Sequence, residues 1–382
     1  MIVFPTSLTQ IGMPGSGDAP VVRAGGTDLG ERRRLGLAPG PLLDLRDLPD
    51  LDTVEWDGLG AATVGAKVRI AEAAADPTLQ KAYPGFTLAA GALATPQIRA
   101  VATLGGNLLQ ANRCWYYRNP DVTCLKKGGA ECFARKGDHL YHSCFDLGPC
   151  ACVHPSTLGM VLMAYDATVM VHGAGDRSVA ELYGDGSDIR GDHRLEPGAV
   201  LTHLVLPPPQ PREQAAYFRA TSRARSEWPL VEVLVRLVLE GETVRFARVA
   251  MGGVAPVPLR LPKVEAALVG GPLTPETLAK AAALAKDGAS PLPMTGYKVE
   301  LVEGTVLETL ERASHASPST YEAMAPAVEP ASGDAPDADG GTPAAADEGA
   351  TATGDAKNGA AKKGAAKKTD AKKAPAEKKE GA

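Results

Sequence analysis

Six cysteines are confined to one short segment of this 382-residue chain, and the rest of the chain has none. They are Cys114, Cys124, Cys132, Cys144, Cys150 and Cys152. Thiols that served only as core residues would be scattered, so this crowding predicts that one segment carries a cofactor. Disulfides need an oxidising compartment, and residues 1–25 lack the pattern of a secretory signal. We therefore expect a metal-binding segment in a cytoplasmic protein.

The composition predicts a folded protein of two or three domains. Apolar residues make up 44% of the chain, which is enough for packed cores. Aromatic residues make up only 5%, and the net charge is −5. We therefore expect neither a surface that stacks on bases nor a general attraction to phosphate backbones, and no specific nucleic acid partner. No apolar run is long enough to span a membrane.

The C-terminal segment has a different composition from the rest of the chain. From residue 314 on, Ala, Pro, Gly, Asp and Glu dominate, and paired lysines follow after residue 357. Such a segment cannot bury enough apolar surface to offset its ordering entropy, which predicts a disordered tail over 314–382. Its lysines could contact nucleic acid or anionic lipid, but a solvated tail without a dedicated partner is the more common outcome.

Two glycine-rich turns predict a site for a long anionic ligand. The first turn follows a predicted strand at 21–23 and precedes a predicted helix at 30–37, and the second follows predicted helices at 70–75 and 87–93. Small residues let backbone N–H groups approach a diphosphate closely. The two turns are Ala24-Gly25-Gly26-Thr27-Asp28-Leu29 and Thr103-Leu104-Gly105-Gly106-Asn107. Neither has the GxGxxG or Walker pattern of the common nucleotide-binding folds.

After a proline-rich stretch at 207–211, the pattern changes to alternating strands followed by helices. Strands are predicted at 217–219, 228–239 and 242–251, with a hairpin through Gly241. Helices are predicted at 274–285 and 300–312. Residues 211–313 are therefore expected to form a compact unit of antiparallel strands and helices.

Four ordered motifs resemble those of the FAD-binding subunit of molybdenum hydroxylases. This family includes the flavin subunits of xanthine, aldehyde and carbon monoxide dehydrogenases and of 4-hydroxybenzoyl-CoA reductase. The resemblance covers about residues 2–313. The motifs are Ala-Gly-Gly-Thr-Asp-Leu at 24–29, Ala-Thr-Pro-Gln-Ile-Arg at 94–99, Thr-Leu-Gly-Gly-Asn at 103–107 and Gly-Gly-Val-Ala-Pro at 252–256.

This resemblance implies an α+β fold. A PCMH-type (vanillyl-alcohol-oxidase-like) FAD-binding domain, made of two α+β subdomains, is expected over 1–206. It would carry the cysteine segment as an insert at about 111–153. A smaller α+β domain like the C-terminal domain of CO dehydrogenase flavoproteins is expected over 211–313, followed by the tail.

The cysteine insert resembles that of a branch of the family with a 4Fe-4S cluster in the flavin subunit. Periplasmic-type aldehyde oxidoreductases and 4-hydroxybenzoyl-CoA reductase belong to this branch. The spacing alone leaves zinc and iron–sulfur open, because it has neither the close run of a ferredoxin nor a CxxC pair. The ligands implied by the resemblance are Cys114, Cys124, Cys132 and Cys150, with Cys144 or Cys152 as alternatives for the fourth. The two remaining cysteines are expected to be buried.

The resemblance also implies which residues hold FAD. The diphosphate is expected on the backbone of residues 24–28, with contacts from Thr27 and Asp28, and the second turn would hold the cofactor from the other side through Thr103, Gly105, Gly106 and Asn107. Thr157 stands where the family has an aspartate that touches the ribityl chain. Arg219 and Arg223 stand near the expected isoalloxazine, although each could equally form a surface ion pair. No catalytic residue is assigned, and we expect His154 to be a satisfied loop histidine.

These implications describe an electron-transfer subunit of a heteromeric oxidoreductase. A molybdenum-cofactor subunit would act on an aldehyde, an aromatic heterocycle or an aromatic acyl-CoA. A 2Fe-2S subunit would exchange electrons with this chain, and FAD would exchange them with NAD, oxygen, quinone or ferredoxin. Two alternatives are a stand-alone PCMH-type flavin oxidoreductase and a non-enzymatic zinc or iron–sulfur binding module.

Overall fold

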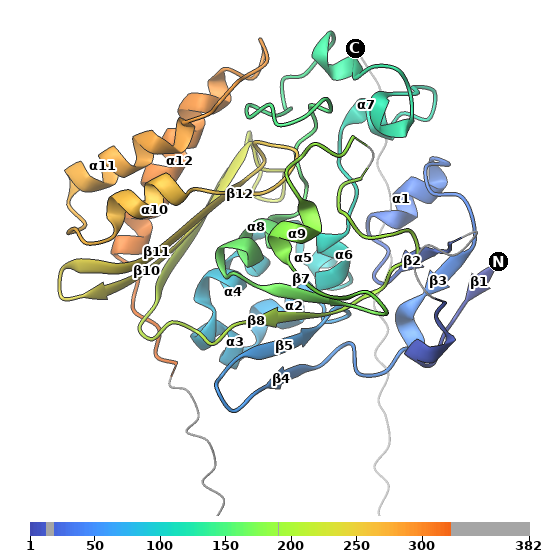
Figure 1. The fold of residues 1–382 in the computed structure, drawn as a ribbon, viewed down its shortest axis with the longest axis horizontal. Coiled ribbons are helices and arrows are strands. Elements are labelled where there is room, and N and C mark those ends of the chain that lie inside the picture. The colour runs from blue at the N-terminus through green and yellow to red at the C-terminus, as the bar shows by residue number, and fades with distance from the viewer. Residues whose placement is uncertain (13–18, 190, 322–382) are drawn as a thin grey trace, which may run out of the picture. The chain divides into compact units, whose positions relative to one another are not determined.

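The structure, a computed structural model, describes residues 1–12, 19–189 and 191–321 (Figure 1). Within these residues the strands form sheets of three, five and four strands. Helices cover the two larger sheets, and this arrangement confirms the predicted α+β class. No helix in the described ranges is long and apolar enough to cross a membrane. Most of the predicted tail lies outside the described residues.

The N-terminal sheet is parallel, and the first glycine-rich turn leaves from its edge. Its strand order is β1-β3-β2, with β1 (Ile2–Val3), β2 (Val21–Arg23) and β3 (Leu42–Asp44). Helix α1 (Leu29–Arg34) follows the turn. The helix predicted over 30–37 ends early because Gly36 adopts a left-handed backbone with φ of 69°, which closes a helix.

The five-stranded sheet is antiparallel and supports the main hydrophobic core. Its order is β4-β5-β8-β6-β7, with β4 (Val54–Trp56), β5 (Ala62–Gly65), β6 (Thr168–Val171), β7 (Gly175–Ser178) and β8 (Leu201–Leu206). Helix α2 matches its predicted range, and α4 begins before its predicted range because Pro84 suits a first helical position. The helices of this part are α2 (Ile70–Ala75), α3 (Pro77–Ala82), α4 (Pro84–Ala92), α5 (Pro96–Arg99), α6 (Leu104–Leu108), α8 (Thr157–Ala164) and α9 (Val179–Tyr183).

The four-stranded sheet is also antiparallel and carries three helices along one face (Figure 1). Its order is β12-β11-β10-β9, with β9 (Gln214–Ala220), β10 (Val231–Glu240), β11 (Thr243–Gly252) and β12 (Leu259–Arg260). The predicted hairpin through Gly241 is confirmed, and β10 begins later than predicted, after Pro229. The helices are α10 (Pro262–Leu268), α11 (Pro275–Ala283) and α12 (Tyr297–Ser314).

A buried ion pair joins this sheet to the main core. The guanidinium of Arg236, on β10, contacts the Glu213 carboxylate at 2.6 Å and lies 3.7 Å from the centre of the Tyr165 ring. The hydroxyl of Tyr165, which follows α8, donates to the same carboxylate at 2.9 Å. Removing one partner of such a buried pair usually costs about 3–5 kcal/mol, because the other charge is left uncompensated.

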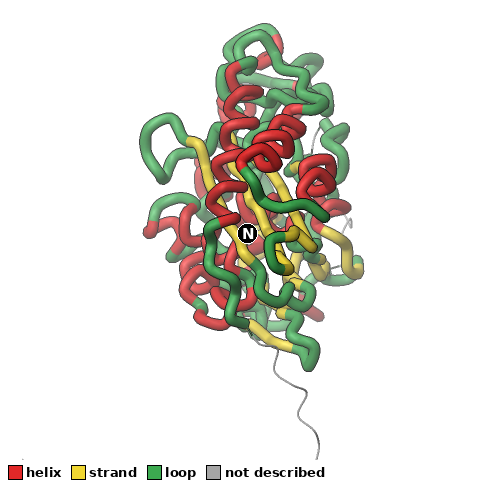
Figure 2. Tube along the Cα trace, turned by 90° about the vertical axis from the view of Figure 1, so that its left-hand side faces the viewer, coloured by secondary structure: helices red, strands yellow, loops and turns green. Residues whose placement is uncertain are grey.

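The cysteine segment is mostly loop between α6 and α8. It contains the short helix α7 (Trp115–Arg118) and the 3-10 turns η3 (Leu125–Lys127) and η4 (Phe133–Arg135). Figure 2 shows mostly loop at the top of the molecule, where this segment lies in Figure 1. Arg135 pairs with Asp146 within the segment, and Lys298 of α12 donates to the carbonyls of Tyr141 and Gly253 at 3.2 and 2.8 Å.

The chain remains packed beyond the end of α12. The ring of Tyr321 stacks on Trp56 with centroids 5.7 Å apart, and the Ser319 N–H donates to the Glu213 carbonyl at 2.7 Å. The predicted start of the tail at residue 314 is therefore too early. Residues 315–321 are held by the Tyr321 ring and by hydrogen bonds of Ser319 and Ala316 to distant parts of the chain, contacts that composition alone does not reveal.

The buried Lys298 ammonium group should make the stability of the protein depend on pH. Burial lowers the pKa of Lys298 from 10.5 to about 8, so the unfolded chain binds more protons than the folded chain between these values. The free energy of unfolding should therefore rise with pH across this window, by up to about 3 kcal/mol for this group. Urea unfolding of the wild type and of Lys298→Met at pH 7 and pH 10 measures it, because the variant lacks the titrating group. Equal pH dependence in both proteins would contradict the assignment.

Candidate functional site

A cavity of about 440 Å³ lies between the two glycine-rich turns; we call it the turn cavity. The predicted residues of both turns come together there, although they are far apart in sequence. Those that line it are Ala24, Gly25, Gly26, Thr27, Asp28, Leu29, Thr103, Gly105 and Gly106. Asn107 lines an adjoining cavity of about 200 Å³, the side cavity. Thr27, Asp28, Gly106 and Gln110 line both, so the two cavities are neighbours that share a wall.

Glycine is required where the two turns approach each other. A Cβ atom on Gly25 would lie 2.2 Å from the carbonyl oxygen of Val101, so no side chain fits there. A Cβ on Gly26 would make only ordinary contact with the Arg23 side chain, at 3.5 Å, but Gly26 adopts φ of 72°, a backbone conformation that favours glycine. A Cβ on Gly105 would lie 2.9 Å from the Ala66 side chain. The backbone therefore forms the wall of the turn cavity, as a diphosphate site needs.

The polar side chains of the second turn hold the protein's own backbone. The Thr103 hydroxyl accepts from the Gly106 N–H at 3.1 Å and caps α6. The Asn107 side-chain oxygen accepts from the Ser156 hydroxyl at 2.9 Å and from the Leu158 N–H at 3.2 Å. These two residues were predicted to contact the ligand, and the structure gives them an additional positioning role.

Asp28 links the first turn to the cysteine segment. Its carboxylate accepts from Arg118 at 2.6 Å and from the Ala111 N–H at 3.0 Å, and it lies 3.2 Å from Arg113. Both arginines also pair with Glu31. Asp28 was predicted to add a polar contact for the ligand, but its charge is already balanced within the protein. It therefore places little repulsion on an anion in the turn cavity.

Thr157 and Arg219 line the side cavity. The sequence analysis expected both residues to lie near the same cofactor. Arg219 donates to the carbonyls of Ala92 and Glu227 at 2.9 and 2.6 Å, which fixes its guanidinium at the cavity wall. Arg223 instead is 89% exposed and pairs with Glu227 at the surface. Of the two arginines, Arg219 alone lines this cavity among the described residues.

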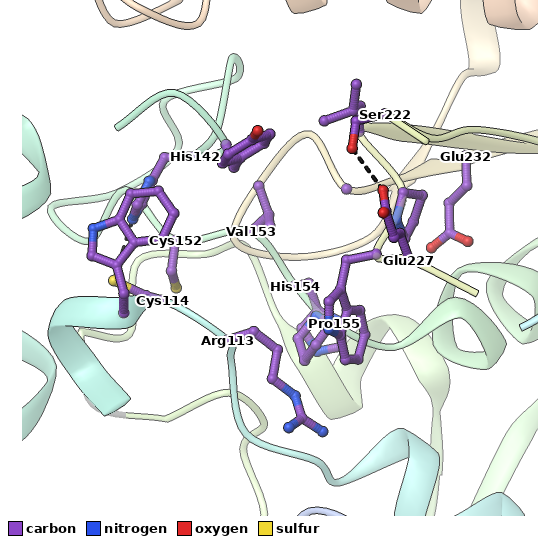
Figure 3. A pocket seen from close by; sticks show the side chains of 16 residues that line it. Arg113, Cys114, His142, Cys152, Val153, His154, Pro155, Ser222, Glu227 and Glu232 are labelled. Carbon is purple, nitrogen blue, oxygen red and sulfur yellow. Dashed lines mark hydrogen bonds between the residues drawn. The ribbon is translucent and has the colours of Figure 1, made fainter. Parts of the chain in front are cut away.

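The sequence analysis missed Glu232, a buried carboxyl group beside Thr157. The Thr157 hydroxyl donates to it at 2.9 Å and the Tyr217 hydroxyl at 2.6 Å. Burial raises the pKa of Glu232, because the charged form loses its hydration. Its signal in the sequence was an acidic residue between apolar residues near the start of a predicted buried strand. Glu232 lines a cavity of about 240 Å³, the aromatic cavity, together with Cys114, His142 and Trp228 (Figure 3).

Five of the six cysteines line one small cavity, which we call the cysteine cavity. They are Cys114, Cys124, Cys132, Cys150 and Cys152. All six cysteines are free, and the thiols of Cys150 and Cys152 are 3.5 Å apart. Cys144 packs instead in the core of the four-stranded sheet, with its N–H donating to the Val254 carbonyl. Cys144 therefore lies apart from the other five cysteines.

The cysteine cavity is narrow, about 10 Å³, which is room for one water molecule. No group of three or more His, Cys, Asp or Glu side chains in the described chain is arranged to hold a metal ion. The predicted ligands thus share a cavity but do not converge on one point. Three of them have a raised pKa. Burial raises the pKa of Cys114 to about 11, and the hydrogen bond with Cys150, together with burial, raises that of Cys132. For Cys150 the hydrogen bond with Cys132 lowers the pKa, but the hydrogen bond with Cys152 and burial outweigh it and raise the pKa to about 12. Any metal that these thiols bind must displace their protons.

Two histidines border these cavities. His154 is a satisfied loop histidine, as predicted: its Nε2 lies 3.2 Å from the Asp192 carbonyl oxygen, and its Nδ1 accepts from the Ser156 N–H. His142, to which the sequence assigned no role, has its Nε2 3.2 Å from the Cys114 sulfur. Burial lowers the pKa of His142 to about 4, so its imidazole is neutral at pH 7.

Comparison with family models assigns both parts of the described chain. Residues 7–209 match the FAD binding domain in molybdopterin dehydrogenase, and residues 216–313 match the CO dehydrogenase flavoprotein C-terminal domain. The predicted fold, an FAD-binding domain followed by a smaller C-terminal domain, is confirmed by these matches and by solved structures.

Similar proteins are flavin subunits of bacterial oxidoreductases. The chain is 32% identical over 256 residues to the aldehyde oxidoreductase FAD-binding subunit PaoB of Escherichia coli, covering 65% of this chain and 79% of that protein. It is 22% identical to the nicotinate dehydrogenase FAD-subunit of Eubacterium barkeri, covering 75% and 85% of the two chains. Among solved structures, carbon monoxide dehydrogenase from Hydrogenophaga pseudoflava has a TM-score of 0.62 at 22% identity, covering 82% of this chain and 96% of that one. Quinoline 2-oxidoreductase from Pseudomonas putida has the same values.

The close approach of Gly25 to the Val101 carbonyl leads to a test of the turn cavity. Gly25→Ala should push the two turns apart and lower both flavin content and melting temperature, because the new methyl group would overlap the Val101 carbonyl. Gly30→Ala is the matched control, since a Cβ at Gly30 meets nothing within 4 Å. Flavin absorbance per chain and thermal unfolding measure both effects. Normal flavin content in Gly25→Ala would contradict the role of this contact.

Proposed function

Because this chain belongs to the family of FAD-binding subunits of molybdenum hydroxylases, we propose that FAD occupies the turn cavity and the side cavity together. The diphosphate would lie on the backbone of residues 24–28 and face Thr103, Gly105 and Gly106. The ring system would extend into the side cavity, next to Thr157 and Arg219. The single observation that supports this proposal is that two adjoining cavities, which share four lining residues, lie against both glycine-rich turns.

When bound, FAD supplies the capacity to accept and donate electrons, and this chain supplies its position and charge environment. Arg219, fixed by two carbonyls, would place a positive charge beside the ring system. Thr157 stands where the family has an aspartate. Its hydroxyl already donates to Glu232, so a buried carboxyl group is still held next to this position by β10. The chain's own residues thus bind and orient the cofactor, and none is assigned a catalytic step.

We further propose that the cysteine cavity holds a 4Fe-4S cluster, with Cys114, Cys124, Cys132 and Cys150 as ligands. Support comes from the donor set: five free thiols of the cysteine segment line one cavity. Thiolate sulfur is the ligand that iron–sulfur clusters require. Cys152 is the alternative to Cys150, because their sulfurs are neighbours. A zinc-binding module is the rival interpretation of the same thiols.

In this role the chain would transfer electrons within a heteromeric oxidoreductase. Relatives described as an FAD-binding subunit and as an FAD-subunit support the heteromer over a stand-alone flavin enzyme. The partners would be a molybdenum-cofactor subunit acting on an aldehyde, an aromatic heterocycle or an aromatic acyl-CoA, and a 2Fe-2S subunit. NAD, oxygen, quinone or ferredoxin would be the external redox partner. Mass spectrometry of co-purifying chains should identify both partners; a purified single chain that turns over substrate would contradict this proposal.

Replacing one thiol separates the proposed cluster from the proposed FAD site. Cys124→Ser should lose iron and acid-labile sulfide but keep most of its flavin, because Cys124 lines the cysteine cavity and neither of the two FAD cavities. Cys144→Ser is the matched control, since Cys144 is buried outside the cysteine cavity and should keep its iron. Iron, sulfide and flavin are measured per chain after anaerobic purification. Zinc without iron in the wild type would favour the binding module.

A further inference from the structure

A buried lysine lies between the cysteine cavity and the turn cavity. Lys126 follows Cys124 on η3, and its side chain is 4% exposed. It lines the cysteine cavity, and among the described residues of that lining it is the one positively charged side chain. Its ammonium group contacts the Asp192 carboxylate at 3.1 Å and donates to the Gly191 carbonyl at 2.6 Å. A charge this deeply buried needs such partners to be tolerated.

Asp192 carries the contact to the other cavity. Its side chain is 10% exposed, and it lines the turn cavity. It also accepts hydrogen bonds from the backbone N–H and the side-chain amide of Asn112, at 3.1 and 3.3 Å. The side-chain oxygen of Asn112 in turn accepts from the Cys114 N–H at 3.1 Å. The ion pair and this amide together form a continuous polar connection from one cavity to the other.

We propose that the Lys126–Asp192 ion pair couples the two cavities, so that a ligand bound in one changes the charge experienced in the other. This inference rests on the proposed cluster and FAD sites. Thiolate ligands add negative charge on one side of the pair, and a diphosphate adds it on the other. The Lys126 side chain lines the cysteine cavity itself, and its ion pair with Asp192 links it to the turn cavity. It acts as a positioning and charge-setting residue and contacts no reacting atom.

Opposite charge changes at the two positions test the coupling. Lys126→Met removes the cation and leaves the Asp192 carboxylate unbalanced, which should lower the reduction potential of the cluster. The same change should raise the FAD dissociation constant about tenfold, the usual size of coupling between two sites. Asp192→Asn should shift the potential in the opposite direction. The double variant should lie closer to the wild type than Lys126→Met does, and Lys126→Arg should stay close to the wild type.

The measurements use the full-length chain, reconstituted anaerobically with iron and sulfide. Potentiometric titration followed by electron paramagnetic resonance gives the potential, and calorimetric titration of FAD into flavin-free protein gives the dissociation constant. Lys127→Met is the matched control, since Lys127 is the next residue and its ammonium group donates at the surface to the Asn119 carbonyl. If Lys126→Met cannot retain iron, recovery of iron in the double variant supports the coupling, and failure to recover it overturns the coupling.

The outcomes separate this inference from the proposed function beneath it. A wild type that takes up no iron overturns the cluster, and the coupling with it. A wild type with iron whose Lys126→Met variant matches Lys127→Met in potential and FAD affinity overturns the coupling alone. Shifts of the same sign in Lys126→Met and Asp192→Asn also overturn it, because a charge effect must change sign with the charge removed.

Discussion

The backbone contact between Gly25 and Val101 is the constraint on which the rest of the site depends. With no side chain between them, the first glycine-rich turn lies directly against the segment that leads into the second, and the two close one wall of the turn cavity. The Asp28 carboxylate, in the same turn, forms an ion pair with Arg118 of α7, the helix that begins directly after Cys114. One close approach therefore sets a wall of the turn cavity and the place where the cysteine segment attaches.

The two aspartates that line the turn cavity have their charges balanced within the protein. Asp28 pairs with Arg118 and Asp192 pairs with Lys126, so neither presents an unbalanced negative charge to the cavity. Glu232 follows a different rule, because it is held by two hydroxyl groups and its pKa is raised by burial. Burial favours the neutral form of this carboxyl group, and the two hydroxyl groups supply its hydrogen bonds in place of a counterion.

Local patterns in the sequence predicted much of this structure. Helix α2, the hairpin through Gly241 and the grouping of the glycine turns follow from short-range signals such as periodicity and turn residues. The roles of Lys126 and Glu232 could not be predicted, because their partners Asp192 and Thr157 are distant in sequence. The different locations of Cys144 and Cys152 could not be predicted either, because both belong to the same cysteine-rich segment. Tertiary packing places Cys144 in the core of the four-stranded sheet and Cys152 in the cysteine cavity.

The stacking of Tyr321 on Trp56 has a practical bearing on how the protein is handled. A shortened chain that ends with α12 would lack Tyr321 and would expose the Trp56 indole, which also stacks on Tyr83. It would also remove the Ser319 contacts to Glu213 and to the Lys81 carbonyl. Such a truncation would expose an aromatic surface and invite self-association. Any shortened version for crystallisation should therefore keep the chain through Tyr321.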